Sequence, residues 1–130
     1  VLRAEARAFA QLIASDLHPI NDNRVRKHLS ERLGAGEDEV LAWCPHWVGA
    51  ALAALEETLA RRRRDWPFCF GDEPGWADLH LVPQMANARR FDCDLSPYPR
   101  LLAVDARCAG LEAFRRARPE AQPDRPPILG

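Results

Sequence analysis

The sequence lacks several features that mark particular classes of protein. Lys27 is the only lysine among 18 basic residues, and the formal net charge is −1, so the charge balance gives no reason to expect nucleic acid or an acidic membrane surface as a partner. No apolar run approaches the roughly 18 residues of a membrane-spanning helix. The amphipathic beginning of the chain, which carries Glu5, does not resemble a signal peptide. We therefore expect a cytoplasmic protein without nucleic-acid or membrane partners.

Closely spaced cysteine pairs are also missing. The cysteines lie far apart in apolar or helical contexts, where a free cysteine behaves as a small hydrophobic residue. A disulfide framework is not expected at this length and spacing. Cys44, His46 and His80 do not have the spacing of a zinc site, so no metal is predicted. The four cysteines are Cys44, Cys69, Cys93 and Cys108.

Strand-like alternation is absent over any convincing length, and apolar residues instead recur every three or four positions. This pattern predicts an all-α chain, and 130 residues suffice for one modest core. The first helix is expected to end near His18-Pro19, because a residue before proline avoids the α region. A second, short helix should stop at Gly34 and Gly36.

A third helix is expected from Glu37 to the arginine run 61–64, with a kink or restart at Pro45. After a loop over 65–75, the segment from Trp76 to Phe91 is apolar around most of its circumference, which is typical of a central buried helix. Shorter helices are expected around 101–108 and 111–116. The domain is predicted to cover 1–118, and 119–130 reads as a proline-rich tail.

Two charged motifs have structural explanations. Asp78 stands three positions after Gly75, where a carboxylate bonds back to the amide that precedes a helix. Arginines 61–64 suit the last turn of a helix, whose carbonyls are exposed. His28, His46 and His80 are interpreted as helix-surface or core residues. None of these motifs requires a catalytic role.

The segment S-D-L-H-P-I-N-D-N-R is far more polar than its flanks and surrounds a proline. An imidazole, a guanidinium and freed backbone groups could form an anion-binding rim there. The alternative is a solvated corner between helices, which is the commoner role of such loops. Arg89 and Arg90 end the helix over 76–91. One is expected to satisfy terminal carbonyls, and the other could hold a carboxylate with two hydrogen bonds.

Three stretches together resemble one family. The stretches D-L-H-P-I-N-D-N-R-V-R-K-H-L, P-F-C-F-G-D-E-P-G-W-A-D-L-H-L-V-P-Q-M-A-N-A-R-R-F and D-L-S-P-Y-P are similar to the C-terminal domain of zeta-class glutathione transferases. That class includes maleylacetoacetate and maleylpyruvate isomerases. The resemblance implies a glutathione-transferase C-terminal helical bundle, without the N-terminal thioredoxin-like domain that precedes it in the family. It also implies a homodimer.

The resemblance further implies a reaction and a set of contacts. Family members use glutathione to isomerise a cis double bond of a dicarboxylate to trans. By position, His18, Asp22, Asn23 and Arg24 match residues that contact glutathione, and Asp22 replaces a more usual asparagine. His18, Arg24 and Arg90 match the side that binds the dicarboxylate substrate.

The chain begins in helical rhythm without a capping residue, so we expect it to be part of something longer. No residue pattern in it would activate a thiol. We therefore predict that the parent protein is the isomerase and that these residues alone are inactive, with no catalytic residue among them. The alternative is a non-catalytic binding or interaction module, since a fold does not determine a function.

Overall fold

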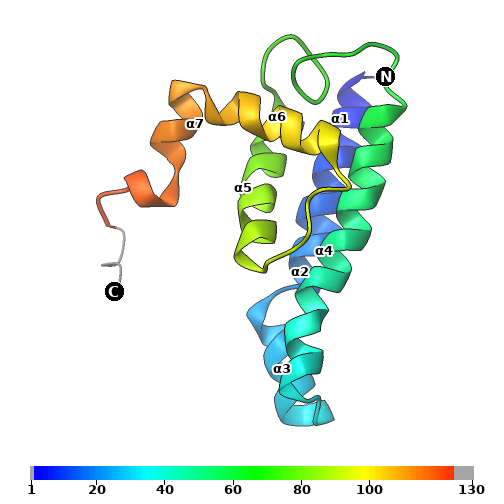
Figure 1. The fold of residues 1–130 in the computed structure, drawn as a ribbon, viewed down its shortest axis with the longest axis vertical. Coiled ribbons are helices and arrows are strands. Elements are labelled where there is room, and N and C mark those ends of the chain that lie inside the picture. The colour runs from blue at the N-terminus through cyan, green and yellow to red at the C-terminus, as the bar shows by residue number, and fades with distance from the viewer. Residues whose placement is uncertain (1, 125–130) are drawn as a thin grey trace.

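The computed structural model describes residues 2–124, and this range consists of helices, turns and loops without a strand. Figure 1 shows a group of long helices, α1, α4 and α5, that run along the molecule. Helix α6 crosses one end of them, and α7 projects to the side. The prediction of an all-α helical bundle is confirmed.

The first helical rod ends at Ile20, close to the predicted end near His18-Pro19, but His18 keeps a helical backbone, so the predicted cause of the end is wrong. It consists of α1 (Leu2–Gln11), a π-helical segment η1 (Leu12–Leu17) and a short α2 (His18–Ile20), so it runs through Pro19. The His18 N–H bonds to the carbonyl of Ile13, five residues earlier. Proline lacks an N–H and crowds the carbonyl four residues before it. The wider π turn accommodates this, and such turns are frequent at functional sites.

The next two helices pack against each other. Helix α3 (Asn23–Leu33) ends at Gly34, whose φ of 69° is left-handed, as the predicted glycine stop requires. Helix α4 (Glu37–Ala60) continues through Pro45, so the predicted restart is wrong. The indole N–H of Trp43 donates to the Ile20 carbonyl at 2.9 Å, and α4 also packs against α3 and η1. These contacts hold the part of the chain around Pro45 in a continuous helix.

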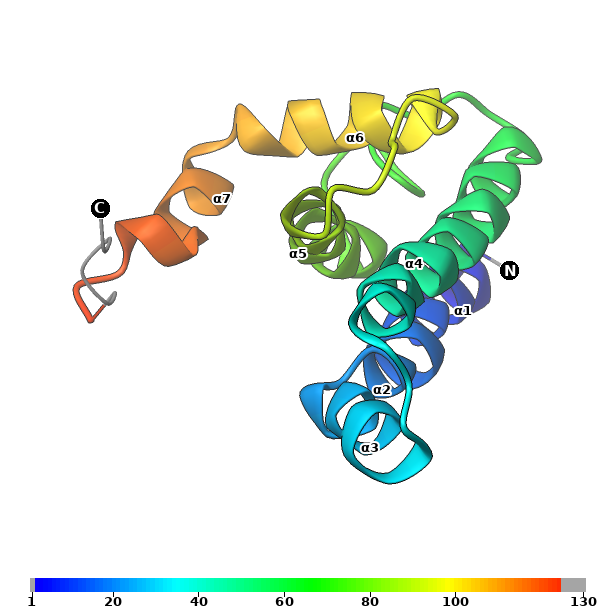
Figure 2. The ribbon, with the colours of Figure 1, turned by 60° about the horizontal axis from the view of Figure 1, so that its bottom comes forward.

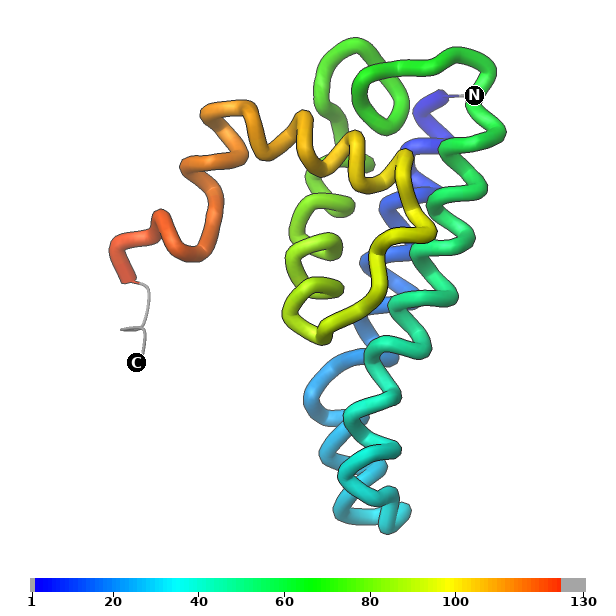
Figure 3. The backbone as a smooth tube through the Cα atoms, in the orientation of Figure 1, coloured from blue at the N-terminus to red at the C-terminus, as the bar shows by residue number. Residues whose placement is uncertain are grey.

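The second half of the chain completes the bundle. Helix α5 (Trp76–Arg90) is followed by α6 (Pro99–Ala109) and α7 (Glu112–Ala117), close to the predicted ranges. A single 3-10 turn, η2 (Pro119–Ala121), follows α7. The tube in Figure 3 shows this end of the chain leading away from the bundle. The predicted tail over 119–130 lies partly outside the described residues, and the proposed domain boundary at 118 stays a prediction.

The core lies between the long helices and α6. Its members come from α1, η1, α4, α5 and α6, and the largest fully buried ones include Ile13, Leu52, Leu55, Leu81, Met85 and Leu101. Helix α5 is not buried all round, contrary to the sequence prediction. Trp76 and Leu79 are each 56% exposed on its outer side. An apolar face of α5 is therefore left uncovered by the rest of residues 2–124.

Two buried carboxylates organise the helix starts. Asp78, 1% exposed, accepts from the backbone N–H of Gly75 at 2.8 Å and from that of Cys69 at 2.9 Å. Glu56 in α4 accepts from the N–H of Arg100 at 3.1 Å and of Leu101 at 3.0 Å, at the beginning of α6. Each carboxylate satisfies amides that have no partner within their own helix. The capping interpretation of Asp78 is confirmed.

The arginine run 61–64 has the structural role that was predicted for it. The Arg62 side chain is 6% exposed and donates to the carbonyls of Leu59, Phe68 and Cys69 at 2.7 to 3.0 Å. It therefore ties the end of α4 to the following loop. No helix among the described residues has the length and apolar character needed to cross a bilayer.

We predict that Asp78→Ala lowers the free energy of unfolding by about 2 to 4 kcal/mol, because it leaves two amides without an acceptor in the interior. Glu39→Ala is the matched control. Its carboxylate caps the amide of Gly36 at 2.7 Å in an exposed setting, so its loss should cost about 0.5 to 1 kcal/mol. Urea unfolding followed by circular dichroism measures both. Equal costs for the two variants would contradict the interpretation of Asp78.

Candidate functional site

The polar corner of the molecule comprises His18 and residues 21–24, where the first rod turns into α3. Asp22 caps α3: its carboxylate accepts from the Arg24 N–H at 2.9 Å, and its backbone is extended. The same carboxylate lies 3.5 Å from the Arg24 Nε. The Arg24 side chain is nevertheless 78% exposed, so most of its donors remain available to a ligand.

Helix α5 reaches this corner from the other half of the chain. The His18 Nε2 lies 3.1 Å from the Oε1 of Gln84. The guanidinium of Arg26 lies 5.2 Å from the centre of the Phe91 ring, within the range of a cation–π contact. These two contacts bring the start of α3 to the C-terminal half of α5, and the ribbon shows α5 ending beside this part of the first rod. Arg90 directly precedes Phe91 and lies at the same end.

The structure separates the roles of the two terminal arginines of α5. Arg89 pairs with the buried Asp105 of α6 at 2.6 Å, so it joins α5 to α6 rather than capping carbonyls. Arg90 is exposed, and its side chain makes no hydrogen bond or ion pair with another residue in the range 2–124. The side chain of Asn23 bonds to Arg26. No hydrogen bond or ion pair among the described residues joins Arg24 to Arg90.

Sequence reasoning missed two polar side chains at the corner. Gln84 is 1% exposed, and its Nε2 has no hydrogen-bond partner in the part of the chain that the structure describes. Both side-chain amide atoms of Asn21 are also buried without a partner among residues 2–124. Buried polar groups are nearly always paired, so unpaired ones call for an explanation such as a ligand or an internal water. An available signal was the glutamine itself, a polar residue between Val82-Pro83 and Met85 in the middle of α5.

The cysteines of the chain do not offer an activated thiol. Burial raises the pKa of the Cys69 thiol strongly and that of Cys108 to about 12. Burial also raises the pKa of Cys93 and of Cys44, where the nearby Arg26 opposes the shift. All four are unpaired and stay protonated near neutral pH. No group of three or more His, Cys, Asp or Glu side chains within residues 2–124 is placed to hold a metal ion.

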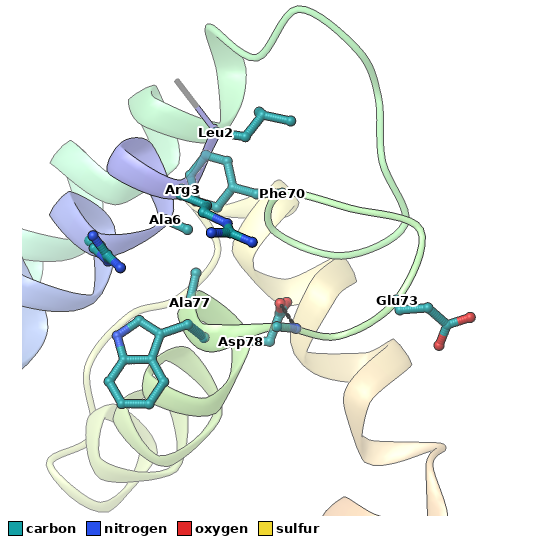
Figure 4. Close-up of a pocket in the computed structure, with 10 residues that line it drawn as sticks. Leu2, Arg3, Ala6, Phe70, Glu73, Ala77 and Asp78 are labelled. Atoms are coloured by element: carbon teal, nitrogen blue, oxygen red, sulfur yellow. Dashed lines mark hydrogen bonds between the residues drawn. The ribbon is translucent and has the colours of Figure 1, made fainter.

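A separate hollow lies away from the polar corner, at the N-terminal ends of α1 and α5. It has a volume of about 580 Å³, and its lining includes Leu2, Arg3, Phe70 and Trp76. In Figure 4, Leu2, Arg3 and Phe70 stand on one side of it and Ala77 on the other. Leu2 is 44% and Trp76 56% exposed. The hollow thus combines an uncovered apolar surface with an arginine, and it contains none of the predicted site residues.

Comparisons with known proteins agree with this architecture. The chain is 48% identical over 122 residues to a maleylpyruvate isomerase of a Ralstonia species, a match that covers 94% of this chain and 58% of that protein. A holo structure of maleylpyruvate isomerase, described as a bacterial zeta-class glutathione transferase, superposes with a TM-score of 0.90 at 47% identity, over 95% of this chain and 58% of that one. The chain matches the C-terminal helical domain of zeta-class glutathione transferases.

A second solved structure adds information on ligands. It is a maleylacetoacetate isomerase from Anaeromyxobacter dehalogenans with dicarboxyethyl glutathione and citrate bound in its active site. It is 40% identical, with a TM-score of 0.87, over 97% of this chain and 55% of that one. The chain therefore spans little more than half the length of the zeta-class proteins it matches. No profile of a known protein family matches the chain.

We predict that Asp22→Ala destabilises the domain by about 1 kcal/mol, because α3 loses its capping acceptor. Asp22→Asn is the matched control, since asparagine caps a helix about as well as aspartate and also removes the negative charge beside Arg24. Its free energy of unfolding should stay within about 0.5 kcal/mol of the original. Thermal and urea unfolding measure both variants. A loss in Asp22→Asn equal to that in Asp22→Ala would show that the charge, and not the cap, stabilises the corner.

Proposed function

We propose that this chain is the helical domain of a glutathione-dependent cis–trans isomerase that acts on a small dicarboxylate, with maleylpyruvate or maleylacetoacetate as the candidate substrates. The match to maleylpyruvate isomerase over 95% of the chain at a TM-score of 0.90 carries this proposal. The relatives reported above are named as isomerases, which favours an enzyme over a non-catalytic binding module.

The polar corner fits a ligand with the chemistry of glutathione. It combines an exposed guanidinium, an imidazole and unpaired amide groups, and glutathione presents carboxylates together with N–H donors. We assign the glutathione contacts to His18, Asp22, Asn23 and Arg24. The Asp22 carboxylate is occupied by its helix cap and by Arg24. Its contribution to the site is therefore to orient the Arg24 backbone and side chain.

The substrate contacts are assigned to His18, Arg24 and Arg90. A dicarboxylate is best held by two guanidinium groups, because each can donate two parallel hydrogen bonds to one carboxylate. Arg24 and Arg90 are exposed and lie at the same end of the molecule. Arg89 is excluded from this role because Asp105 already holds it.

When bound, glutathione would supply a thiol that adds across the cis double bond, allows rotation about the resulting single bond and is then eliminated, which restores the double bond as trans and frees the glutathione. The residues of this chain bind and orient; they do not activate that thiol, since its own cysteines are protonated and no base in the corner is paired with a nucleophile. The bound dicarboxyethyl glutathione in the Anaeromyxobacter enzyme is consistent with a site that receives a thiol and a dicarboxylate together.

The parent protein is proposed to carry a thioredoxin-like domain that binds glutathione and to form a homodimer in the cytoplasm. The matched relatives are longer than this chain, and the uncovered apolar side chains of Leu2, Trp76 and Leu79 suit burial against a further domain. Apolar patches of more than a few hundred Å² are unusual on free monomers.

We predict that the 130-residue chain alone shows no isomerase activity and binds glutathione weakly or not at all, because nothing in it activates or encloses the thiol. Calorimetric titration with glutathione and an isomerisation assay on maleylpyruvate test this. Micromolar binding by the chain alone would contradict the proposed division between the two domains.

We also predict an effect on catalysis in a longer protein, in which this chain is preceded by the N-terminal domain that its relatives have. There, Arg24→Ala or Arg90→Ala should lower kcat/KM about tenfold to a few hundredfold. This range corresponds to about 1.5 to 3 kcal/mol for a hydrogen bond to a charged group. Arg→Lys should recover only part of the loss, since an ammonium cannot form the paired hydrogen bonds. The assay compares maleylpyruvate with maleylacetoacetate.

Arg63→Ala is the control for these variants. Arg63 is exposed and lies just after the C-terminal end of α4, whereas the polar corner lies near the other end of that helix. Its kcat/KM should stay unchanged. Glutathione affinity should change much less than kcat/KM in the Arg90 variant. An unchanged kcat/KM in both the Arg24 and the Arg90 variant would show that these arginines do not bind the substrate.

A further inference from the structure

Gln84 is a buried polar residue whose side chain is not explained by packing. It is 1% exposed in the middle of α5, next to the fully buried Met85. Methionine or leucine would fill a similar volume without burying an amide. The Gln84 Nε2 has no partner within residues 2–124, and an unpaired buried donor is unfavourable. The one hydrogen bond that its side chain makes is therefore the feature to explain.

That hydrogen bond joins two elements 66 residues apart, with the His18 Nε2 at 3.1 Å from the Gln84 Oε1. An amide oxygen only accepts, so the proton of a neutral His18 ring lies on Nε2, and Nδ1 is left as an acceptor. His80 shows the opposite arrangement. Its Nδ1 donates to the backbone carbonyl of Trp76 at 2.9 Å, which leaves Nε2 as the acceptor.

The bond also restricts an otherwise exposed ring. His18 follows the π-helical segment on the surface of the corner, where a free side chain would sample several rotamers. A buried partner on a rigid helix reduces this freedom and presents one ring nitrogen in a fixed direction. The nearby amide of Asn21, also unpaired and buried, supplies further polar atoms on the same turn of the chain.

We propose that Gln84 is a positioning residue: it holds His18 through Nε2, so that Nδ1 accepts a hydrogen bond from an N–H group of glutathione, either the α-ammonium or a peptide amide. This inference rests on the proposed function for the identity of the ligand. The hydrogen bond itself does not depend on it. Gln84 does not contact the reacting atoms in this scheme; it acts through His18.

The first test uses the 130-residue chain and needs no ligand. Nitrogen-15 NMR of the histidine rings at pH 8.5 should show His18 protonated on Nε2 and His80 protonated on Nδ1. Gln84→Met should make the His18 Nε2 proton exchange faster with water, leave His80 unchanged as an internal control, and keep or raise the melting temperature. Protonation of His18 on Nδ1, or an unchanged exchange rate in Gln84→Met, would overturn the proposal.

The second test is a double-mutant cycle. It uses the longer protein, in which this chain is preceded by the N-terminal domain that its relatives have. Gln84→Met and His18→Ala should each raise the glutathione KM about three- to tenfold, with little change in kcat or in the dicarboxylate KM. The double variant should be no worse than the single ones, because both remove the same contact. Additive losses, or equal effects on kcat, would mean a general structural role and refute positioning.

The two tests separate the possible failures. If the longer protein without any substitution binds no glutathione, the proposed function is wrong. The glutathione contact assigned to His18 is then wrong as well. The NMR result would still decide whether Gln84 holds the ring. If glutathione binds and the cycle is non-additive, both the proposed function and the positioning role are supported.

Discussion

The carboxylate of Asp78 is the interaction on which the placement of α5 depends. With one oxygen on the amide of Gly75 and the other on that of Cys69, it starts the helix and anchors the preceding loop in the interior. Arg62 secures the other side of the same loop through backbone carbonyls. Because a helix is rigid, a fixed start determines where Gln84 and Arg90, two and four turns further on, arrive. The polar corner is therefore positioned by contacts at the far end of the bundle.

The other wall of the corner depends on how the first rod passes Pro19. Pro19 has no N–H to donate and crowds the carbonyl four residues before it, and the wider turns of the π-helical segment accommodate both effects. The rod therefore continues to Ile20 before the chain turns at Asp22. Trp43 then ties this end to α4 through the Ile20 carbonyl. A helix that ended before Pro19 would place His18 in a loop. The continued rod instead keeps His18 on a helical surface, at hydrogen-bond distance from Gln84.

Local patterns predicted the elements well and the long-range pairs poorly. Helical periodicity, the glycine at position 34 and the acidic residue at position 78 act within a few residues, so they can be read directly from the sequence. The passage through Pro19 uses a π-helical segment, which apolar periodicity does not reveal. The continuity of α4 at Pro45 goes with contacts to other parts of the bundle, such as the one from Trp43 to Ile20. The uncovered face of α5 was likewise invisible, since apolar periodicity does not reveal which face has a partner. The pairing of His18 with Gln84 joins distant segments, and no spacing rule indicates it.

The arginines of residues 2–124 differ in where their side-chain donors go. Arg62 spends its hydrogen bonds on carbonyls, and Arg89 and Arg100 pair with the carboxylates of Asp105 and Glu56. Removing Arg89 would leave the buried Asp105 carboxylate without this partner, and removing Arg62 would take a donor from the carbonyls of Phe68 and Cys69, so these two arginines are needed for the fold. Within residues 2–124 the exposed Arg24 side chain has an ion pair with Asp22 alone, and the exposed Arg90 side chain has no partner. Donors that the fold does not use are available to a ligand, which supports the contacts proposed for Arg24 and Arg90.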